Sequence, residues 1–203
     1  MKCLSMWQPH ASAVSVGSKR IETRHWETWY RGPLAIHAAK RRVLSELLDY
    51  HDDWVWIGAL TALGWSSGNE VAADLALLPL GAVIATCNLV DCRPSESFTR
   101  DEIETPRYPD RPNPELYAWR ESEMGNFGPR RFGWVLENIV RLPTPIPFIG
   151  HQTLFNVPDE LIQASIEGRP LPLPPRPKKA ALPKPAPPPA PPEPMQTTFA
   201  FER

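Results

Sequence analysis

Half of the prolines in this chain fall in one C-terminal stretch, which limits how much of it can form a packed domain. Thirteen of the 26 prolines lie between Pro170 and Pro194. Proline fixes φ and lacks the N–H group that helices and sheets use, so this density excludes regular hydrogen-bonded structure. We therefore predict a folded domain over residues 1–168 and a disordered, basic, proline-rich tail over residues 169–203, largely in the polyproline II conformation.

Charge is unevenly distributed along the 203 residues, although the net charge is only −1. The tail holds six basic and two acidic residues (+4), which leaves 16 basic and 21 acidic residues (−5) in the body. Residues 1–42 reverse the balance of the body, with eight basic side chains and two acidic ones. This pattern favours either a local patch that faces an anion or an ordinary solvated surface, and charge alone leaves both open.

The cysteine and histidine content predicts neither a disulfide framework nor a bound metal or cofactor. The three cysteines, Cys3, Cys87 and Cys92, form no CxxC pair, and Cys3 and Cys87 sit in apolar runs typical of buried strands. The five histidines show no H-E-x-x-H spacing. No apolar stretch approaches the roughly 18 residues that span a bilayer, and no signal peptide is evident, so we expect a cytoplasmic protein without membrane contact.

Short apolar runs with β-branched residues predict a small mixed or antiparallel sheet. Helical spacing is found in a segment from Pro9 to Gly17, in a helical insertion over about 41–80 and in a final helix over 158–166. Residues 93–130 are otherwise irregular, and a short helix over 115–123 is a further candidate. No regular βαβ alternation is visible, which favours an α+β barrel over a doubly wound sheet. The predicted strands are residues 3–7, 19–26, 33–38, 81–90 and 132–142.

Three charged residues, Lys19, Glu22 and Arg24, follow the first helix closely. In an extended segment Glu22 and Arg24 share one face, and a bend near Lys19 could bring all three to one rim. One carboxylate between two cations suits an anionic or amide-bearing ligand. The same trio could equally be a salt-bridge cluster that anchors the helix to the sheet.

Aromatic and polar residues beside this trio are further candidates for ligand binding. Trp7 and Gln8 precede the helix, where an indole could stack on a base and an amide could bond its edge. The alternative is a core tryptophan and a glutamine that satisfies the helix N-terminus. Lys40 and Arg131 could bind phosphate, whereas a single histidine at a strand end, His37, is more typical of a structural residue.

Several segments in register resemble the ASCH domain family. The family's G-x-K-x-x-E-x-R pattern is matched by Gly17, Lys19, Glu22 and Arg24. The resemblance covers about residues 3–160, and its segments are LSMWQPHAS, GSKRIETR, YRGPLAIHAAK, LPLGAVIATCNLVDC and FGPRRFGWVLENIVRLPTPIP. It implies a PUA-like β-barrel with a helix at its mouth and a cleft for RNA or a modified base. Known members include ribonucleases, a branch that deacetylates a modified cytidine, and part of a transcription coactivator.

The chain departs from the deacetylating branch at a decisive position. That branch carries a hydroxyl residue three positions after its lysine, where this chain has Glu22. It is also smaller and lacks anything like residues 41–80. The lysine matches at Lys19, but the nucleophile does not, so the catalytic set of that branch is not carried over.

These observations lead to three hypotheses of different classes. The first is an RNA- or nucleotide-binding protein whose cleft uses Trp7, Gln8, Lys19, Glu22, Arg24, Lys40 and Arg131. The second is a hydrolase acting on RNA or a modified nucleoside, with Lys19 and Glu22 as its catalytic groups. The third is an adaptor that docks through its tail, because Gln196, Phe199 and Phe201 resemble the short peptides that bind the bacterial sliding clamp.

Overall fold

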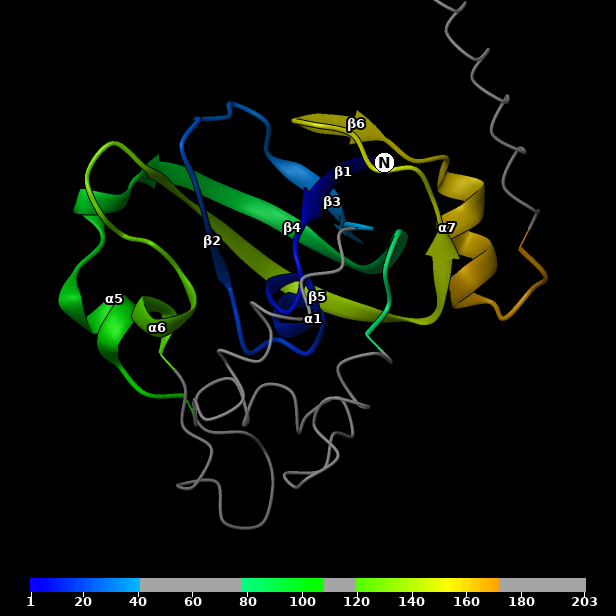
Figure 1. Ribbon diagram of the computed structural model, residues 1–203, viewed down its shortest axis with the longest axis horizontal. Coiled ribbons are helices and arrows are strands. Elements are labelled where there is room, and N and C mark those ends of the chain that lie inside the picture. The colour runs from blue at the N-terminus through cyan, green and yellow to red at the C-terminus, as the bar shows by residue number, and fades with distance from the viewer. Residues whose placement is uncertain (41–77, 108–119, 172–203) are drawn as a thin grey trace, which may run out of the picture.

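The computed structural model describes residues 1–40, 78–107 and 120–171, which form a six-stranded mixed sheet with short helices (Figure 1). The strand order is β2-β5-β4-β3-β1-β6. All neighbouring strands are antiparallel except β1 and β3, which run parallel. The strands are β1 (Lys2–Met6), β2 (Ile21–Arg24), β3 (Gly32–Ala38), β4 (Ala82–Pro94), β5 (Phe132–Pro147) and β6 (Leu154–Asn156).

The sheet is buried on both faces, which explains why β3 is apolar along nearly its whole length. Leu34 and Ile36 belong to one core cluster, whereas Ala35 between them belongs to a second cluster on the opposite face. Helix α1 (His10–Ser15) contributes to the first cluster through Val14. Helix α7 (Asp159–Ile166) covers the second face through Ile162. Each buried aliphatic side chain of this kind contributes about 1.5–3 kcal/mol.

The sheet curls far enough to bring its two ends together. Three strands separate β2 from β1 in the sheet order. Even so, Arg24 at the end of β2 donates a hydrogen bond of 2.7 Å to the backbone carbonyl of Ser5 in β1. This curled half-barrel confirms the predicted α+β architecture, and all five predicted strands lie in it.

Strand β5 continues five residues beyond its predicted end, through a segment rich in proline. The amide of Phe148 donates to Gly81 O at 3.0 Å, on the side of β4. In a strand, every second residue directs its N–H group to the same neighbouring strand. The N–H groups missing at Pro143, Pro145 and Pro147 would therefore point away from β4, toward the other side of β5. Strand β2 pairs with β5 only at Phe132–Val135, so these prolines interrupt none of its bonds.

Some short elements were not predicted from the sequence. Strand β6 pairs with β1 through three residues only, too few to show a periodic pattern. A 3-10 helix (Ser95–Ser97) and helix α5 (Arg100–Glu104) lie where we expected irregular structure, whereas α6 (Glu121–Met124) overlaps the described end of the short helix that we considered over 115–123. Helix α5 begins with a capping box between Thr99 and Glu102, a T-x-x-E signal that is visible in the sequence.

The helices mark the two ends of the sheet. In Figure 1, α5 and α6 lie at one end of β4 and β5, and α7 lies at the other. The N-terminal amine of Met1 donates to Val157 O at 2.8 Å and pairs with Asp159, which ties β1 to the start of α7. As predicted, α1 stops at a glycine, Gly17, with φ of +78°.

Two predicted regions lie almost entirely outside the described residues. The helical insertion over 41–80 is described only at 78–80, and the tail over 169–203 only at 169–171. The domain boundary near residue 168 therefore stays a prediction.

Within the described ranges, no helix is long and apolar enough to cross a membrane, and no group of three or more His, Cys, Asp or Glu residues could hold a metal ion. All three cysteines are free and buried.

Candidate functional site

The side chain of Lys19 is completely buried and fully paired. Its ammonium donates to Ile21 O at 2.6 Å and to Met124 O at 2.8 Å, and it lies 3.6 Å from the carboxylate of Glu22. Gly125 closes over it, since a Cβ there would lie 3.3 Å from Nζ. Lys19 therefore joins the end of α6 to the start of β2 and presents no free N–H group to a ligand.

Glu22 and Arg24 complete a chain of ion pairs that starts at Lys19. Glu22 is 9% exposed, and one of its carboxylate oxygens lies 2.9 Å from Nε of Arg24. Burial alone would raise the pKa of Glu22, but the charges of Lys19 and Arg24 outweigh burial, and its pKa lies below the usual range. The three residues thus come together as the sequence suggested, in an arrangement that favours the structural interpretation for Lys19 and Glu22.

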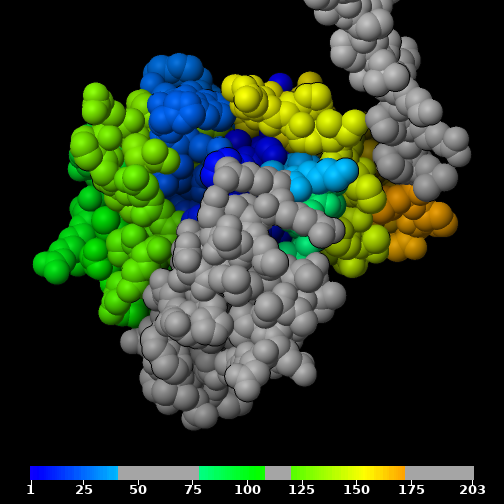
Figure 2. Space-filling view, viewed as in Figure 1, coloured from blue at the N-terminus to red at the C-terminus, as the bar shows by residue number. Residues whose placement is uncertain are grey.

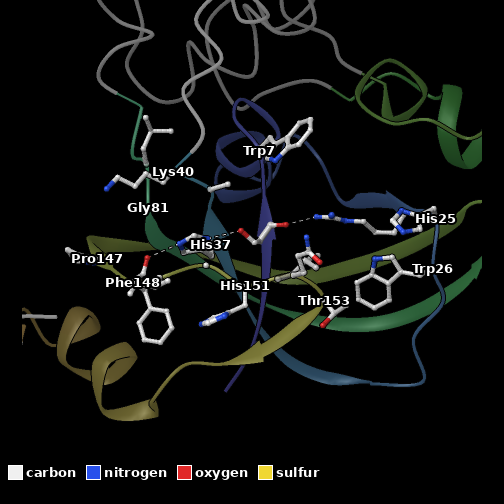
Figure 3. A pocket seen from close by; sticks show the side chains of 18 residues that line it. Trp7, His25, Trp26, His37, Lys40, Gly81, Pro147, Phe148, His151 and Thr153 are labelled. Carbon is white, nitrogen blue, oxygen red and sulfur yellow. Dashed lines mark hydrogen bonds between the residues drawn. The ribbon is translucent and has the colours of Figure 1, made fainter. Parts of the chain in front are cut away.

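A large cavity opens on the other side of Arg24, where the sheet curls. Its volume is about 1440 Å³. The ends of β1, β2 and β3, the start of β4 and the loop 147–153 after β5 form its walls (Figure 3). Figure 2 shows the dark-blue N-terminal residues and the cyan residues near position 40 between the green segment with α5 and α6 and the yellow segment with β6.

Only some of the binding residues that the sequence suggested line the cavity. Trp7, Arg24 and Lys40 line the cavity, whereas Gln8, Lys19, Glu22 and Arg131 are not among its lining residues. Gln8 is 4% exposed, accepts a hydrogen bond from the amide of Ser12 and donates one to Pro79 O. It thereby satisfies the first turn of α1, which was the alternative interpretation. Arg131 donates to Thr23 O at 3.1 Å and ties β5 to β2.

The cavity is lined by cations and imidazoles. Arg24 and Lys40 carry positive charge, and the histidines are His25, His37 and His151. No aspartate or glutamate is among the described residues that line it. The remaining lining is apolar or neutral, with Trp7 and Trp26 as its indoles. Such a surface favours anionic ligands and carries no buried carboxylate to repel them.

Trp7 and Trp26, the two indoles of the cavity, differ in how they are held. The side chain of Trp7 is 53% exposed at the end of β1. Trp26 packs edge-on against the core residue Trp134, with ring centroids 4.6 Å apart. The indole N–H of Trp134 also points to Trp26 O at 3.4 Å. Trp26 is thus a rigid wall of the cavity, whereas about half of the Trp7 side chain is accessible.

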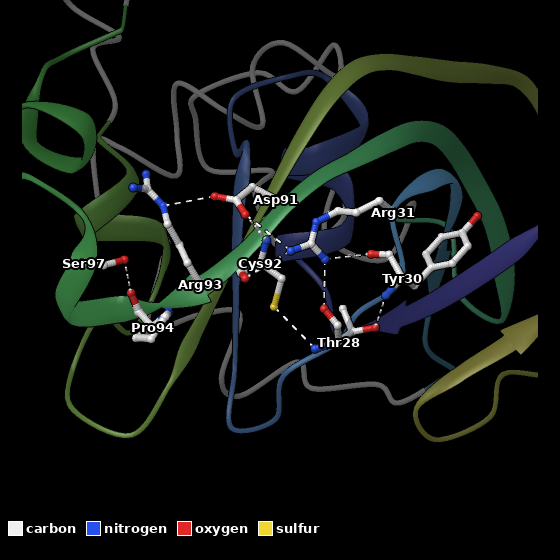
Figure 4. A network of polar contacts seen from close by, with 8 residues as sticks. All are labelled: Thr28, Tyr30, Arg31, Asp91, Cys92, Arg93, Pro94 and Ser97. Atoms are coloured by element: carbon white, nitrogen blue, oxygen red, sulfur yellow. Dashed lines mark hydrogen bonds and ion pairs between the residues drawn. The ribbon is translucent and has the colours of Figure 1, made fainter.

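The loop that carries His25 and Trp26 is fixed to β4 by a polar network (Figure 4). Arg31 donates to Thr28 O at 2.9 Å and to Cys92 O at 3.2 Å, and it lies 3.4 Å from Asp91. The amide of Thr28 lies 3.5 Å from Cys92 Sγ. Of these contacts only the one between Arg31 and Asp91 is exposed, and together they hold the loop against β4.

A serine and a histidine meet on the floor of the cavity. Ser5 Oγ lies 2.9 Å from His37 Nδ1, and His37 Nε2 lies 3.1 Å from Phe148 O. Burial lowers the pKa of His37, and the nearby His151 adds to this, while the bond to Phe148 opposes it. The sequence identified His37 as structural and did not single out Ser5, because no local pattern pairs residues 32 positions apart.

A family model described as ASCH domain matches residues 4–135. This chain belongs to the ASCH domain family. The match begins within β1, includes the Gly17–Arg24 motif and the strands β2 to β4, and ends within β5. The loop 147–153, which forms one wall of the cavity, lies beyond the matched segment.

A solved structure of an ASCH protein is similar to this ASCH chain. It is the crystal structure of a point mutant of the ASCH protein from Zymomonas mobilis, with 13% sequence identity and a TM-score of 0.42. The similarity covers 82% of this chain and 96% of the Zymomonas chain. No curated protein matches the sequence.

Proposed function

We propose that this ASCH domain binds single-stranded RNA or a nucleotide-like ligand in the cavity beside Arg24. The observation that carries the proposal is the cavity's lining, which combines Arg24 and Lys40 with three histidines and no carboxylate among its described residues. Nucleic-acid clefts of this class pair cations for the phosphates with aromatic surfaces for the bases. Trp7, half exposed at the edge of the cavity, supplies such a surface.

The size of the cavity favours a strand over a single enclosed base. Sites for small molecules typically measure about 300–1,000 Å³. The cavity here, at about 1440 Å³, exceeds that range. In Figure 3, Lys40 lies on one side of the cavity and His25 and Trp26 on the other, so phosphate and base contacts could be spread along a short strand.

Fluorescence anisotropy with short labelled RNAs tests the proposal. Replacing Trp7 with alanine should remove a stacking contact worth about 1–3 kcal/mol, or roughly 5- to 150-fold in affinity. Trp29→Ala is the matched control, because Trp29 is 87% exposed and does not line the cavity. Equal affinities for the two variants would contradict the proposal.

Lys40 offers a second, electrostatic readout. Lys40→Gln should weaken binding to all sequences alike and reduce the slope of log K against log salt by about one phosphate contact. Arg100→Gln, at an exposed position on α5 outside the cavity lining, should leave that slope unchanged. An unchanged salt slope in Lys40→Gln would remove Lys40 from the binding site.

The rival hypothesis of a hydrolase that uses Lys19 and Glu22 finds less support in this geometry. Both side chains would have to reach the substrate, yet Lys19 is fully buried and its ammonium donates to two backbone carbonyls. Turnover through these residues would require β2 and α6 to separate. Incubation with labelled RNAs and modified nucleosides, with Lys19→Arg as the variant, would show whether any turnover depends on this amine.

A further inference from the structure

Ser5 and His37 are direct neighbours in the sheet, on strands that run parallel. They face each other in the β1–β3 register, which places both side chains on the same side of the sheet. Both line the cavity, with Ser5 Oγ 2.9 Å from His37 Nδ1 (Figure 3). The pair therefore meets the distance requirement for proton transfer between a hydroxyl and an imidazole.

The second ring nitrogen fixes the direction of this hydrogen bond. A backbone carbonyl can only accept, so His37 Nε2, at 3.1 Å from Phe148 O, carries the proton. In the neutral ring, Nδ1 is then the acceptor, and the Ser5 hydroxyl donates to it. Burial lowers the pKa of His37 and keeps the ring neutral near pH 7. The carbonyl of Phe148 thus orients the imidazole as a base toward the serine.

The surroundings of the pair favour an anionic group at the serine. Arg24 donates to the carbonyl of Ser5 itself at 2.7 Å, which fixes a positive charge beside the residue. Gly150 lies over the pair, since a Cβ at this position would lie 2.5 Å from His37 Cε1 and 3.0 Å from Ser5 Oγ. Only a glycine leaves this much space, and His37 beneath it is buried.

We propose that Ser5 and His37 form a nucleophile–base pair that hydrolyses carboxylic esters of anionic molecules entering the cavity. Ser5 Oγ attacks the ester carbonyl carbon while its proton passes to His37 Nδ1, and Arg24, bonded to the Ser5 carbonyl, supplies a positive charge close to the oxyanion that forms. The carbon–oxygen bond to the leaving group then breaks, and the departing alcohol takes the proton from Nδ1. Water repeats the sequence on the acyl-enzyme, releases the acid and restores Ser5.

This inference goes beyond RNA binding and does not rest on it. A fluorophosphonate reagent, which phosphonylates only activated serines, tests it on the full chain by intact mass and peptide mapping. We expect a single adduct at Ser5 that disappears in Ser5→Ala and in His37→Gln but persists in Ser97→Ala. Ser97 is the matched control because it is exposed and its Oγ donates to Pro94 O instead of to a histidine. No adduct at Ser5, or an adduct unaffected by His37→Gln, would overturn the proposal.

A cysteine replacement keeps the test valid if His37→Gln fails to fold. Ser5→Cys retains the side-chain size, and His37 should promote formation of its thiolate. The three native cysteines are buried. We expect iodoacetamide to alkylate Cys at position 5 at least about tenfold faster than Cys at position 97, although position 97 is more exposed. Slower alkylation at position 5 would overturn the proposal, and RNA binding by the same variants is scored separately.

Discussion

The sharpest consequence of the structure concerns Lys19, the residue that the sequence placed at the mouth of a binding cleft. Replacing it with methionine keeps much of its volume but removes the ammonium. Two buried carbonyls, Ile21 O and Met124 O, then lose their donor, and Glu22 loses one of the two cations with which it forms ion pairs in the described structure. Removing one partner of a buried ion pair costs about 3–5 kcal/mol. For a domain of this size, that loss corresponds to a fall in Tm of roughly 6–20 °C.

The effect should depend on pH in a direction that the pKa of Glu22 sets. The pKa of Glu22 is lower in the folded protein than in the unfolded chain, where it is about 4.3. The ionised carboxylate therefore stabilises the folded protein at pH values above the unfolded pKa. This stabilisation is lost as the pH falls through the folded pKa. In Lys19→Met the Glu22 carboxylate is still buried but has lost the positive charge of Lys19. Protonation of the carboxylate removes the cost of burying its negative charge. The difference in unfolding free energy between wild type and variant should therefore be largest at pH 7 and narrow below about pH 4.5.

Urea unfolding at pH 7 and at pH 4, followed by tryptophan fluorescence, measures both effects. Lys40→Met is the matched control, because Lys40 is exposed and its replacement should change stability by less than about 0.5 kcal/mol. RNA affinity measured at low denaturant should be retained in Lys19→Met. A variant that is as stable as wild type but has lost RNA binding would refute the structural role and restore Lys19 to the binding site.

Two further predictions test other parts of the molecule. Gly150→Ala should destabilise the domain by about 1–3 kcal/mol and abolish fluorophosphonate labelling of Ser5, because the added methyl group would clash with the His37 ring. Normal labelling of this variant would contradict the close contact between Gly150 and His37. Beyond residue 171 the tail lies outside the described residues, and we propose from its sequence that it docks on a sliding clamp. A synthetic peptide of residues 192–203 should displace a known clamp peptide at micromolar concentration, and no displacement at high micromolar concentration would remove this hypothesis.

The sequence by itself determined the class of the domain and most of its strands. Alternation and β-branched runs identified the cores of β3, β4 and β5, because the period of two is a local property of a strand. Glycine at position 17 ended α1 for an equally local reason, its freedom to adopt positive φ. The family motif was also readable, since it lies within eight consecutive residues.

Only the tertiary structure decided which of these residues can meet a ligand. Lys19 is enclosed by Met124 O, 105 positions along the chain, and local spacing carries no information about such a neighbour. Ser5 faces His37 because β1 pairs parallel with β3, and His37 is held by Phe148, 111 positions away. Sequence patterns specify which face of an element is apolar. The curl of the sheet brings its ends together, and this curvature determines whether a charged side chain becomes a buried support or part of an open cleft.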